Sequence, residues 1–174
     1  MAAVIDYLDH VEIGLCQRIN RLGRKELVRR FFEVISRLGD YGFWVASGVG
    51  LLLLQGSEAL PDILRLGVTA VAGVAIYKLL KRTLIRERPF IASGNILCGA
   101  APLDRYSFPS GHTLHAVSFT ILFANLEPAF LYVCAPFAVL VAVSRVILGL
   151  HYPSDVVVGA ALGASIAQVS IALA

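Results

Sequence analysis

The chain has 174 residues, of which 57% are hydrophobic and 16% are charged, with a formal net charge of +3. Soluble domains usually carry about 25% charged residues. The composition therefore excludes a disordered, collagen-like or coiled-coil chain and disfavours an ordinary soluble enzyme. The three cysteines are widely spaced and form no CxxC pair, so they indicate neither a disulfide framework nor a zinc site. The length suits one domain, and the expected solvent is a lipid bilayer.

Two amphipathic helices are predicted before the most apolar part of the chain. In residues 3–20 and again in 26–38, apolar residues recur at steps of three and four, with charged residues between them. This pattern is typical of helices that lie in the membrane interface without crossing it.

Five stretches with few or no charged residues follow, and each is close to the ~20 residues that a helix needs to cross a ~30 Å hydrocarbon layer. They are residues 41–57, 63–80, 106–126, 128–144 and 156–174. The sequence therefore predicts an all-α fold, a polytopic membrane bundle of about five transmembrane helices with N-terminal interfacial helices. We expect one integral-membrane domain over 1–174, with interfacial helices in 1–39 and the bundle with the active site in 40–174.

The connections between these stretches are very unequal in length. The longest, residues 81–108, holds four arginines, two prolines and two glycines. Because crossings alternate sides, this loop and residues 145–155 emerge on the same face. Within the second segment, Gly149 is expected to end one helix and Pro153 to begin the next. Polar chemistry is thus concentrated on one face of the bundle.

The first polar cluster on that face is Lys81 followed, after six residues, by Arg88-Pro89. If the helix continues past Lys81, a seven-residue step places Lys81 and Arg88 on one side, two turns apart. Pro89 then turns the chain. The alternative is a basic collar that only flanks the membrane.

The second cluster is Pro109-Ser110-Gly111-His112, immediately before a predicted crossing. Ser110 is suited to cap this helix, and the free N–H groups of the first turn form a ready anion site. The alternative is a plain cap followed by an interfacial histidine.

The third cluster runs from Ser144-Arg145 through His151 to Asp155. Four residues separate His151 from Asp155, so the carboxylate is able to hold one imidazole nitrogen and leave the other free. An arginine at membrane depth needs an anionic partner. The alternative is therefore a structural ion pair between Arg145 and Asp155.

Together the clusters supply three cations, a helix N-terminus and two histidines on one face. Cations and backbone N–H groups suit a phosphoryl group, whose oxygens are charged in the transition state. Two histidines suit a nucleophile and a proton donor. No carboxylate cluster suited to Mg²⁺ stands in the sequence, so we expect no metal or other cofactor. The residues alone favour phosphate-ester hydrolysis at a membrane surface.

The sequence resembles the type 2 phosphatidic acid phosphatase superfamily, whose site is related to that of vanadium haloperoxidases. Its three signatures, K-x6-R-P, P-S-G-H and S-R-x5-H-x3-D, all occur unbroken between Lys81 and Asp155. The resemblance implies that His151 is the nucleophile that forms a phosphohistidine, that Asp155 orients it, and that His112 protonates the leaving oxygen. The phosphate-binding residues that it implies are Lys81, Arg88, Ser110, Gly111 and Arg145.

Substrate choice is not decided by any residue. A site at the membrane surface favours a lipid with a terminal phosphate or diphosphate, and we favour undecaprenyl diphosphate. The alternatives are phosphatidate, phosphatidylglycerophosphate and lipid A 1-phosphate. A non-catalytic lipid-phosphate-binding or transport protein is a further alternative, but binding needs only the cations. The expected partners are the substrate and the bilayer, with no nucleic acid.

The resemblance implies a multi-pass protein of the inner membrane with its site facing the periplasm, or the lumen in eukaryotes. The arginine-rich N-terminus lies on the same side, which the positive-inside rule assigns to the cytoplasm. The family placement has more weight, because catalytic cations inflate the count. A sixth crossing through 26–38 would remove the conflict, but Arg29, Arg30, Glu33 and Arg37 argue against it.

Overall fold

The computed structural model describes the backbone of residues 2–102 and 104–174, and the side chains of residues 11–102 and 104–174. All regular structure in these residues is helical, which confirms the predicted all-α class. The α-helices are α1 (Ala2–Gly23), α2 (Glu26–Arg37), α3 (Phe43–Gln55), α4 (Leu60–Thr83), α5 (Pro89–Ala92), α6 (Gly111–Leu126), α7 (Leu131–Ile147) and α8 (Pro153–Ala172). Three short turns, η1 (Leu38–Gly42), η2 (Gly56–Ala59) and η3 (Pro128–Phe130), join some of them.

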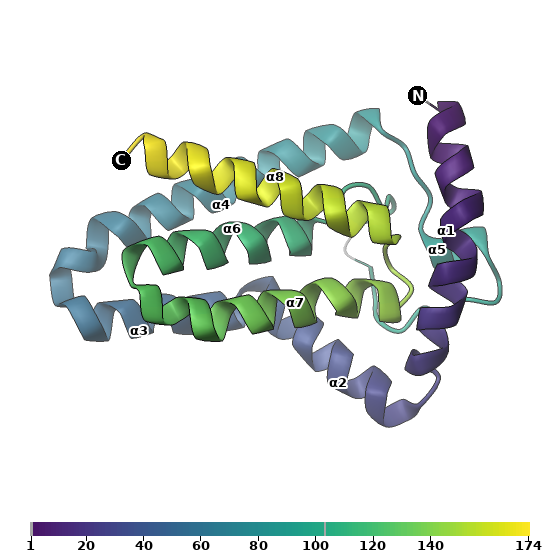
Figure 1. Ribbon diagram of the computed structural model, residues 1–174, viewed down its shortest axis with the longest axis horizontal. Helices are drawn as coiled ribbons and strands as arrows, with labels where there is room; N and C mark the ends of the chain where they lie inside the picture. Colours follow the sequence, from purple (N-terminus) through teal and green to yellow (C-terminus); the bar gives the residue numbers. More distant parts are fainter. Residues whose placement is uncertain (1, 103) are drawn as a thin grey trace.

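Five helices, α3, α4, α6, α7 and α8, run along the long axis of the molecule and form a bundle (Figure 1). Helix α6 lies inside this bundle and packs against α4, α7 and α8. It approaches α8 closely because Gly159 and Gly163 face the backbone of Ser110 and Leu114, where a β-carbon would be too close. Small residues on the last helix therefore allow tight packing.

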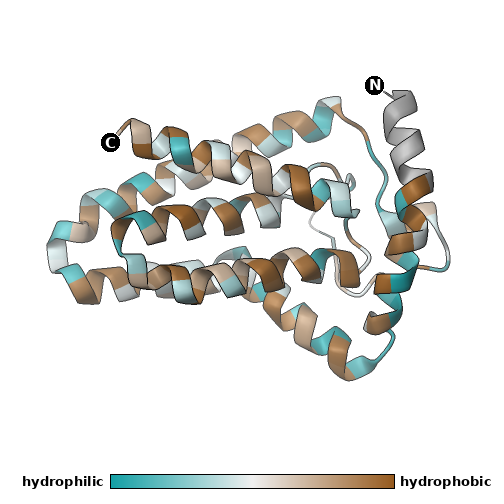
Figure 2. Ribbon diagram, in the orientation of Figure 1, coloured by the Kyte–Doolittle hydropathy of each residue, from teal (hydrophilic) through white to brown (hydrophobic). Residues whose placement is uncertain are grey.

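The interior and the exterior of the bundle are both apolar. Inside, Trp44, Leu51 and Phe123 are buried, and the Phe43 ring stacks on Phe137 with centroids 3.8 Å apart. Outside, large side chains such as Leu53 are up to 83% exposed, and apolar residues recur along every bundle helix (Figure 2). So large an apolar exterior suits a lipid environment, where helices satisfy their own backbone hydrogen bonds.

In the part of the chain that the structure describes, three helical stretches are long and apolar enough to cross a membrane, namely the continuous run Glu26–Thr83, Pro128–Ile147 and Pro153–Ala172. The first run includes both α3 and α4. Each predicted crossing corresponds to one bundle helix, although the third begins at Gly111 and not at residue 106. The length and apolar character of these helices indicate a multi-pass membrane protein.

One expectation about the first cluster is wrong. Helix α4 ends at Thr83, and Arg88 has an extended backbone with φ −75° and ψ 150°. The seven-residue step from Lys81 to Arg88 is therefore not helical. The turn between α7 and α8 follows its prediction, because Gly149 has φ +73° after the end of α7 and Pro153 begins α8.

The N-terminal helices lie outside the bundle. Helix α1 crosses one end of it, and α2 leaves the bundle at an angle (Figure 1). Helix α2 packs against α7 and buries Ile35 and Ser36, while apolar residues such as Leu27, which is 83% exposed, remain uncovered. The apolar residues predicted in the first half of α1 lie outside the described side chains.

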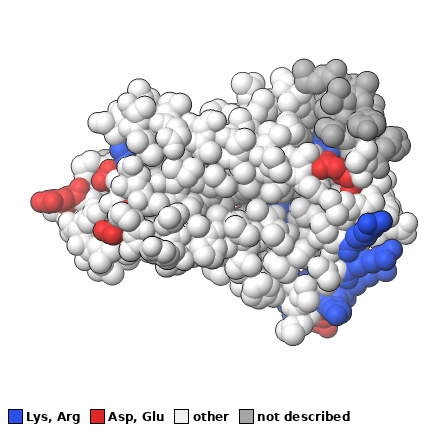
Figure 3. Space-filling view, viewed as in Figure 1, with Lys and Arg blue, Asp and Glu red and all other residues white. Residues whose placement is uncertain are grey.

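Charge is segregated along the long axis. Basic side chains gather at the end where α1 meets α2, with a few acidic ones beside them, and most charged side chains at the opposite end are acidic, while the middle has little charge (Figure 3). The exposed basic residues at the first end are Arg18, Arg21, Arg24, Lys25, Arg30 and Arg37. The long loop of residues 84–110 lies at this same end (Figure 1), so the polar chemistry is gathered there, as the connection lengths predict.

Candidate active site

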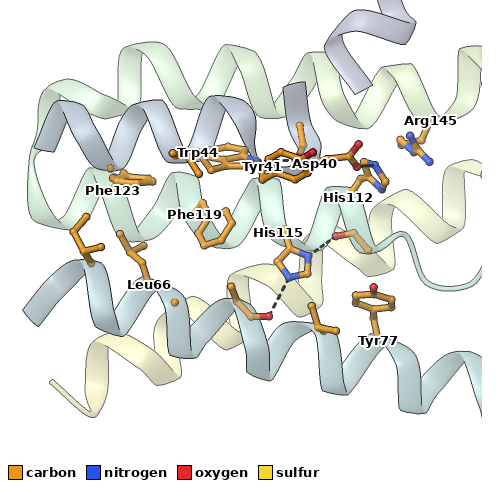
Figure 4. Close-up of a pocket in the computed structure, with 18 of the residues that line it drawn as sticks. Asp40, Tyr41, Trp44, Leu66, Tyr77, His112, His115, Phe119, Phe123 and Arg145 are labelled. Atoms are coloured by element: carbon orange, nitrogen blue, oxygen red, sulfur yellow. Dashed lines mark hydrogen bonds and ion pairs between the residues drawn. The ribbon is translucent and has the colours of Figure 1, made fainter. Parts of the chain in front are cut away.

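The three clusters meet at the polar end of one cavity of about 520 Å³. Helices α4, α6 and α7 each contribute to this end, together with the loop before α5 and the turn before α8. The predicted site residues that line it are Lys81, Arg88, Gly111, His112, Arg145 and His151. From there the cavity continues between α3, α4 and α6 past Trp44, Phe119 and Phe123 (Figure 4).

His151 and Asp155 are held as a pair by the start of α8. The Nδ1 atom of His151 lies 3.4 Å from Oδ2 of Asp155, whose carboxylate is fully buried. The same oxygen accepts a hydrogen bond of 2.9 Å from the backbone N–H of Tyr152, which completes a capping box. The predicted approach of the carboxylate to one imidazole nitrogen is thus present in the structure, at ion-pair distance and without the geometry of a hydrogen bond.

The other ring nitrogen of His151 is directed at a basic environment. Its Nε2 atom lies 3.4 Å from a guanidinium nitrogen of Arg88. Burial, followed by the nearby charges of Arg145, Arg88 and Lys81, lowers the pKa of His151 well below its usual value of 6.5. The imidazole is therefore neutral at neutral pH, with an electron pair available for attack.

Lys81 and Arg88 meet through a carboxylate that sequence reasoning missed. The ammonium of Lys81 donates to both carboxylate oxygens of Asp104 at 2.8 Å, and Arg88 donates to one of them at 2.7 Å. Burial favours a higher pKa for Asp104, but the hydrogen bond and charge of Lys81 and the charge of Arg88 bring the pKa below its usual value. An anionic group with two oxygens therefore fits between these two cations.

Arg145 faces the cavity from the end of α7. One of its guanidinium nitrogens donates to the hydroxyl of Ser36 in α2, and its Nε atom has no hydrogen-bond partner among the described residues. The alternative of a structural ion pair between Arg145 and Asp155 is not what the structure contains, because Asp155 pairs with Arg86. Arg145 thus keeps donor capacity for a ligand anion.

The second cluster forms the start of α6. Ser110 caps the helix, as predicted: its Oγ accepts from the N–H of Thr113 at 3.4 Å and lies 2.9 Å from the Thr113 hydroxyl. The side chain is fully buried and does not line the cavity, so a phosphate contact requires its hydroxyl to turn. Gly111 lines the cavity beside the Tyr77 ring. His112 lies 2.6 Å from Asp40, measured from Nε2 to Oδ1.

Arg86 is a second residue of the site that sequence reasoning did not single out. Its buried guanidinium donates to Asp155 at 2.5 Å and to Glu12 of α1 at 2.8 Å, and it lies 3.9 Å above the Tyr152 ring. One signal in the sequence could have indicated Arg86. Residues two apart in an extended segment lie on the same side, so Arg86 shares a side with Arg88. Asp40 and Asp104 had no local signal, since their partners are distant in the sequence.

Comparison with known proteins identifies the family. The profile of the PAP2 superfamily matches residues 62–174, and the chain belongs to this superfamily. Similar curated proteins include decaprenylphosphoryl-5-phosphoribose phosphatase of Mycobacterium tuberculosis, 35% identical over 125 residues that cover 68% of this chain and 67% of the relative. Undecaprenyl-diphosphatase of Sulfolobus acidocaldarius is 28% identical over 139 residues, or 79% of this chain and 66% of the relative.

Two solved structures have the same fold. The crystal structure of Aquifex aeolicus LpxE matches with a TM-score of 0.74 at 26% identity, covering 92% of this chain and 94% of that one. A PAP2-type phosphatidylglycerolphosphate phosphatase of Bacillus subtilis matches with a TM-score of 0.63 at 21% identity, covering 98% and 92%. The family resemblance stated from the three motifs is thereby confirmed.

The buried network around Arg86 generates a prediction. Arg86→Met removes the cation between Asp155 and Glu12, and breaking a buried pair in this way costs about 3–5 kcal/mol. We expect a lower unfolding temperature in detergent and a large loss of turnover. Arg82→Met is the matched control, since Arg82 is exposed on the last turn of α4. Equal behaviour of the two variants would contradict a structural role for Arg86.

Proposed function

We propose that this protein is a phosphohydrolase of the membrane that removes the terminal phosphate from a lipid phosphate or diphosphate. The observation that carries this proposal is the shape of the cavity, whose polar end leads without interruption into an apolar length lined by Trp44, Phe119 and Phe123 (Figure 4). A charged headgroup and a hydrocarbon chain are accommodated in one space. The family and the names of its relatives agree with this assignment.

The first chemical step follows from the positions of the two histidines. With the phosphate between Lys81, Arg88 and Arg145, the Nε2 electron pair of His151 attacks phosphorus and the bond to the leaving oxygen breaks. His112, as imidazolium, gives that oxygen a proton. Asp155 stabilises the positive charge that develops on the phosphorylated ring.

The second step releases the phosphate. Neutral His112 takes a proton from a water molecule, which attacks the phosphohistidine. The bond between phosphorus and nitrogen breaks, and its electron pair returns to His151. Both histidines are then restored, and inorganic phosphate leaves. In this scheme the three cationic side chains stabilise the charge on the phosphoryl oxygens, so the reaction requires no metal ion.

For the lipid itself we favour undecaprenyl diphosphate. The cavity is a single channel of about 520 Å³, which suits the first part of one polyprenyl chain better than the several chains of a lipid A molecule. Two relatives are named for polyprenyl-linked substrates. Phosphatidate, phosphatidylglycerophosphate and lipid A 1-phosphate are the alternatives.

A lipid-phosphate-binding or transport protein is the non-enzymatic alternative. The cations alone would suffice for binding, whereas two histidines that each contact a carboxylate are suited to proton and phosphoryl transfer. The hypothesis of an enzyme also explains why the ring of His151 is buried and neutral.

We further propose that residues 1–174 form one domain, with interfacial helices in 1–39 and the bundle in 40–174. The site then faces the periplasm from the inner membrane. This proposal rests on the family resemblance, which has more weight than the basic surface around the α1–α2 turn at the same end, although the positive-inside rule assigns such a surface to the cytoplasm.

Phosphate release from a lipid panel tests the proposed activity. The panel contains undecaprenyl diphosphate, phosphatidate, phosphatidylglycerophosphate and lipid A 1-phosphate, each in mixed micelles with purified protein. We expect the highest turnover with undecaprenyl diphosphate and none with His151→Ala, which removes the nucleophile. Binding of these lipids without phosphate release from any of them would support the non-enzymatic alternative and overturn the proposal.

Metal independence is tested by chelation. Because Lys81, Arg88 and Arg145 supply the charge that the transition state needs, excess EDTA should leave turnover of the purified protein nearly unchanged. Dialysis against EDTA followed by the same assay provides the measurement. A loss of turnover that added Mg²⁺ restores would contradict this part of the mechanism.

A further inference from the structure

His112 has an acidic partner that comes from a distant part of the chain. Its Nε2 atom lies 2.6 Å from Oδ1 of Asp40, and its side chain is only 11% exposed. Asp40 belongs to η1, the π-helical turn between α2 and α3. Figure 4 shows the two side chains in contact at the polar end of the cavity, with Arg145 beyond His112.

The backbone around Asp40 is held firmly in its unusual conformation. The N–H of Phe43 bonds to the carbonyl of Leu38, five residues earlier, which defines the π turn. The indole N–H of Trp44 donates to the carbonyl of Gly39 at 3.0 Å. Gly39 itself packs so closely on Val141 of α7 that a β-carbon would lie 2.8 Å from a methyl group. Such π turns are rare and occur frequently at functional sites.

This turn lies outside the region that the family profile matches, which begins at residue 62. The same part of the chain also provides Ser36, whose hydroxyl accepts a hydrogen bond from Arg145. The end of α2 and η1 thus support two residues of the site, the proposed proton donor and a proposed phosphate ligand. Among the described residues, only Asp40 makes a hydrogen bond or ion pair with the His112 ring.

We propose that Asp40 is the positioning residue of the general acid. Its carboxylate accepts the N–H of His112 at Nε2, fixes the orientation of the ring and stabilises the imidazolium. The proton at Nδ1 is then the one transferred to the leaving oxygen when the bond to phosphorus breaks. After that transfer the ring is neutral, retains its bond to Asp40, and accepts a proton from the attacking water at Nδ1. This role rests on the proposed function.

The inference has a specific kinetic consequence. A proton donor matters most when the leaving group is a strong base, such as an alkoxide, and little when it is a nitrophenolate. A positioning role therefore lowers kcat for an alkyl phosphate selectively and leaves KM unchanged, because the phosphate contacts of Lys81, Arg88 and Arg145 remain. A merely structural role would lower turnover of both esters alike.

The experiment compares dodecyl phosphate with 4-nitrophenyl phosphate in Asp40→Asn, His112→Ala and the double variant. General acid catalysis is worth about 10²–10⁴-fold, so we expect Asp40→Asn to lose about 10–10²-fold in kcat on dodecyl phosphate and much less on 4-nitrophenyl phosphate. The double variant should lose no more than His112→Ala, because both changes remove one function. Equal losses on the two esters, or additive losses in the double variant, would overturn the proposal.

Two further variants act as controls. Glu33→Gln removes an acid from α2 whose partner is Arg37 on the surface, and it should behave as the wild type. Asp40→Glu keeps the charge and should retain a larger share of the dodecyl phosphate turnover than Asp40→Asn. Ring nitrogen shifts of ¹⁵N-labelled histidine, measured without substrate, should change for His112 in Asp40→Asn. An unchanged His112 signal would contradict the pairing even if activity were lost through misfolding.

The outcomes separate this inference from the proposed function. If the lipids are hydrolysed and Asp40→Asn behaves as Glu33→Gln does, the role of Asp40 is wrong and the proposed function stands. If no lipid is hydrolysed while the two simple esters show the selective loss, the lipid assignment is wrong and the role of Asp40 stands.

Discussion

The fully buried carboxylate of Asp155 is the constraint on which the rest of the site depends. An unpaired charge at this depth would be prohibitively costly, and the structure compensates it from three directions. Arg86 supplies a cation at 2.5 Å, the N–H of Tyr152 donates at 2.9 Å, and the His151 ring lies at 3.4 Å. Through these contacts the loop after α4 and the turn before α8 are both held at the carboxylate of Asp155. Glu12 extends the network to α1 through Arg86.

Charge pairing of the same kind organises the remaining polar end of the cavity. Lys81 and Arg88 share the carboxylate of Asp104, and His112 contacts Asp40. Arg145 differs, because its hydrogen-bond partner is the neutral hydroxyl of Ser36 and its Nε has none among the described residues. A phosphate would therefore gain most from Arg145 and would compete with Asp104 for the other two cations. The apolar exterior of the bundle leaves this end as the place where such a headgroup is accommodated.

Sequence reasoning predicted the parts of this arrangement that depend on local chemistry. The cap at Ser110, the helix ends at Gly149 and Pro153, and the spacing of His151 and Asp155 all follow from neighbouring residues, and the structure contains each of them. The hydrophobic stretches predicted the five bundle helices, because a helix in a lipid bilayer must present apolar side chains on its surface.

Contacts between distant segments could not be predicted in this way. The end of α4 at Thr83 left Lys81 and Arg88 in different backbone conformations, so only tertiary folding brings both to Asp104. Asp40 has the ordinary appearance of an acid at the edge of an apolar stretch, and the π turn that directs it at His112 has no sequence signature. The single sequence also contains no signal that pairs Arg86 with Asp155, although alternation along the extended segment places Arg86 on the same side as Arg88 and on the other side from Glu87.

Trapping the covalent intermediate tests the central claim, that His151 held by Asp155 is the nucleophile. Purified protein is mixed with ³²P-labelled 4-nitrophenyl phosphate, quenched rapidly with alkali, digested and mapped by mass spectrometry. The account predicts an acid-labile, alkali-stable phosphate on Nε2 of His151 in the wild type and in His112→Ala, and none in His151→Ala. A phosphate on His112 or on an acidic side chain, or hydrolysis by His151→Ala at the wild-type rate, would contradict it.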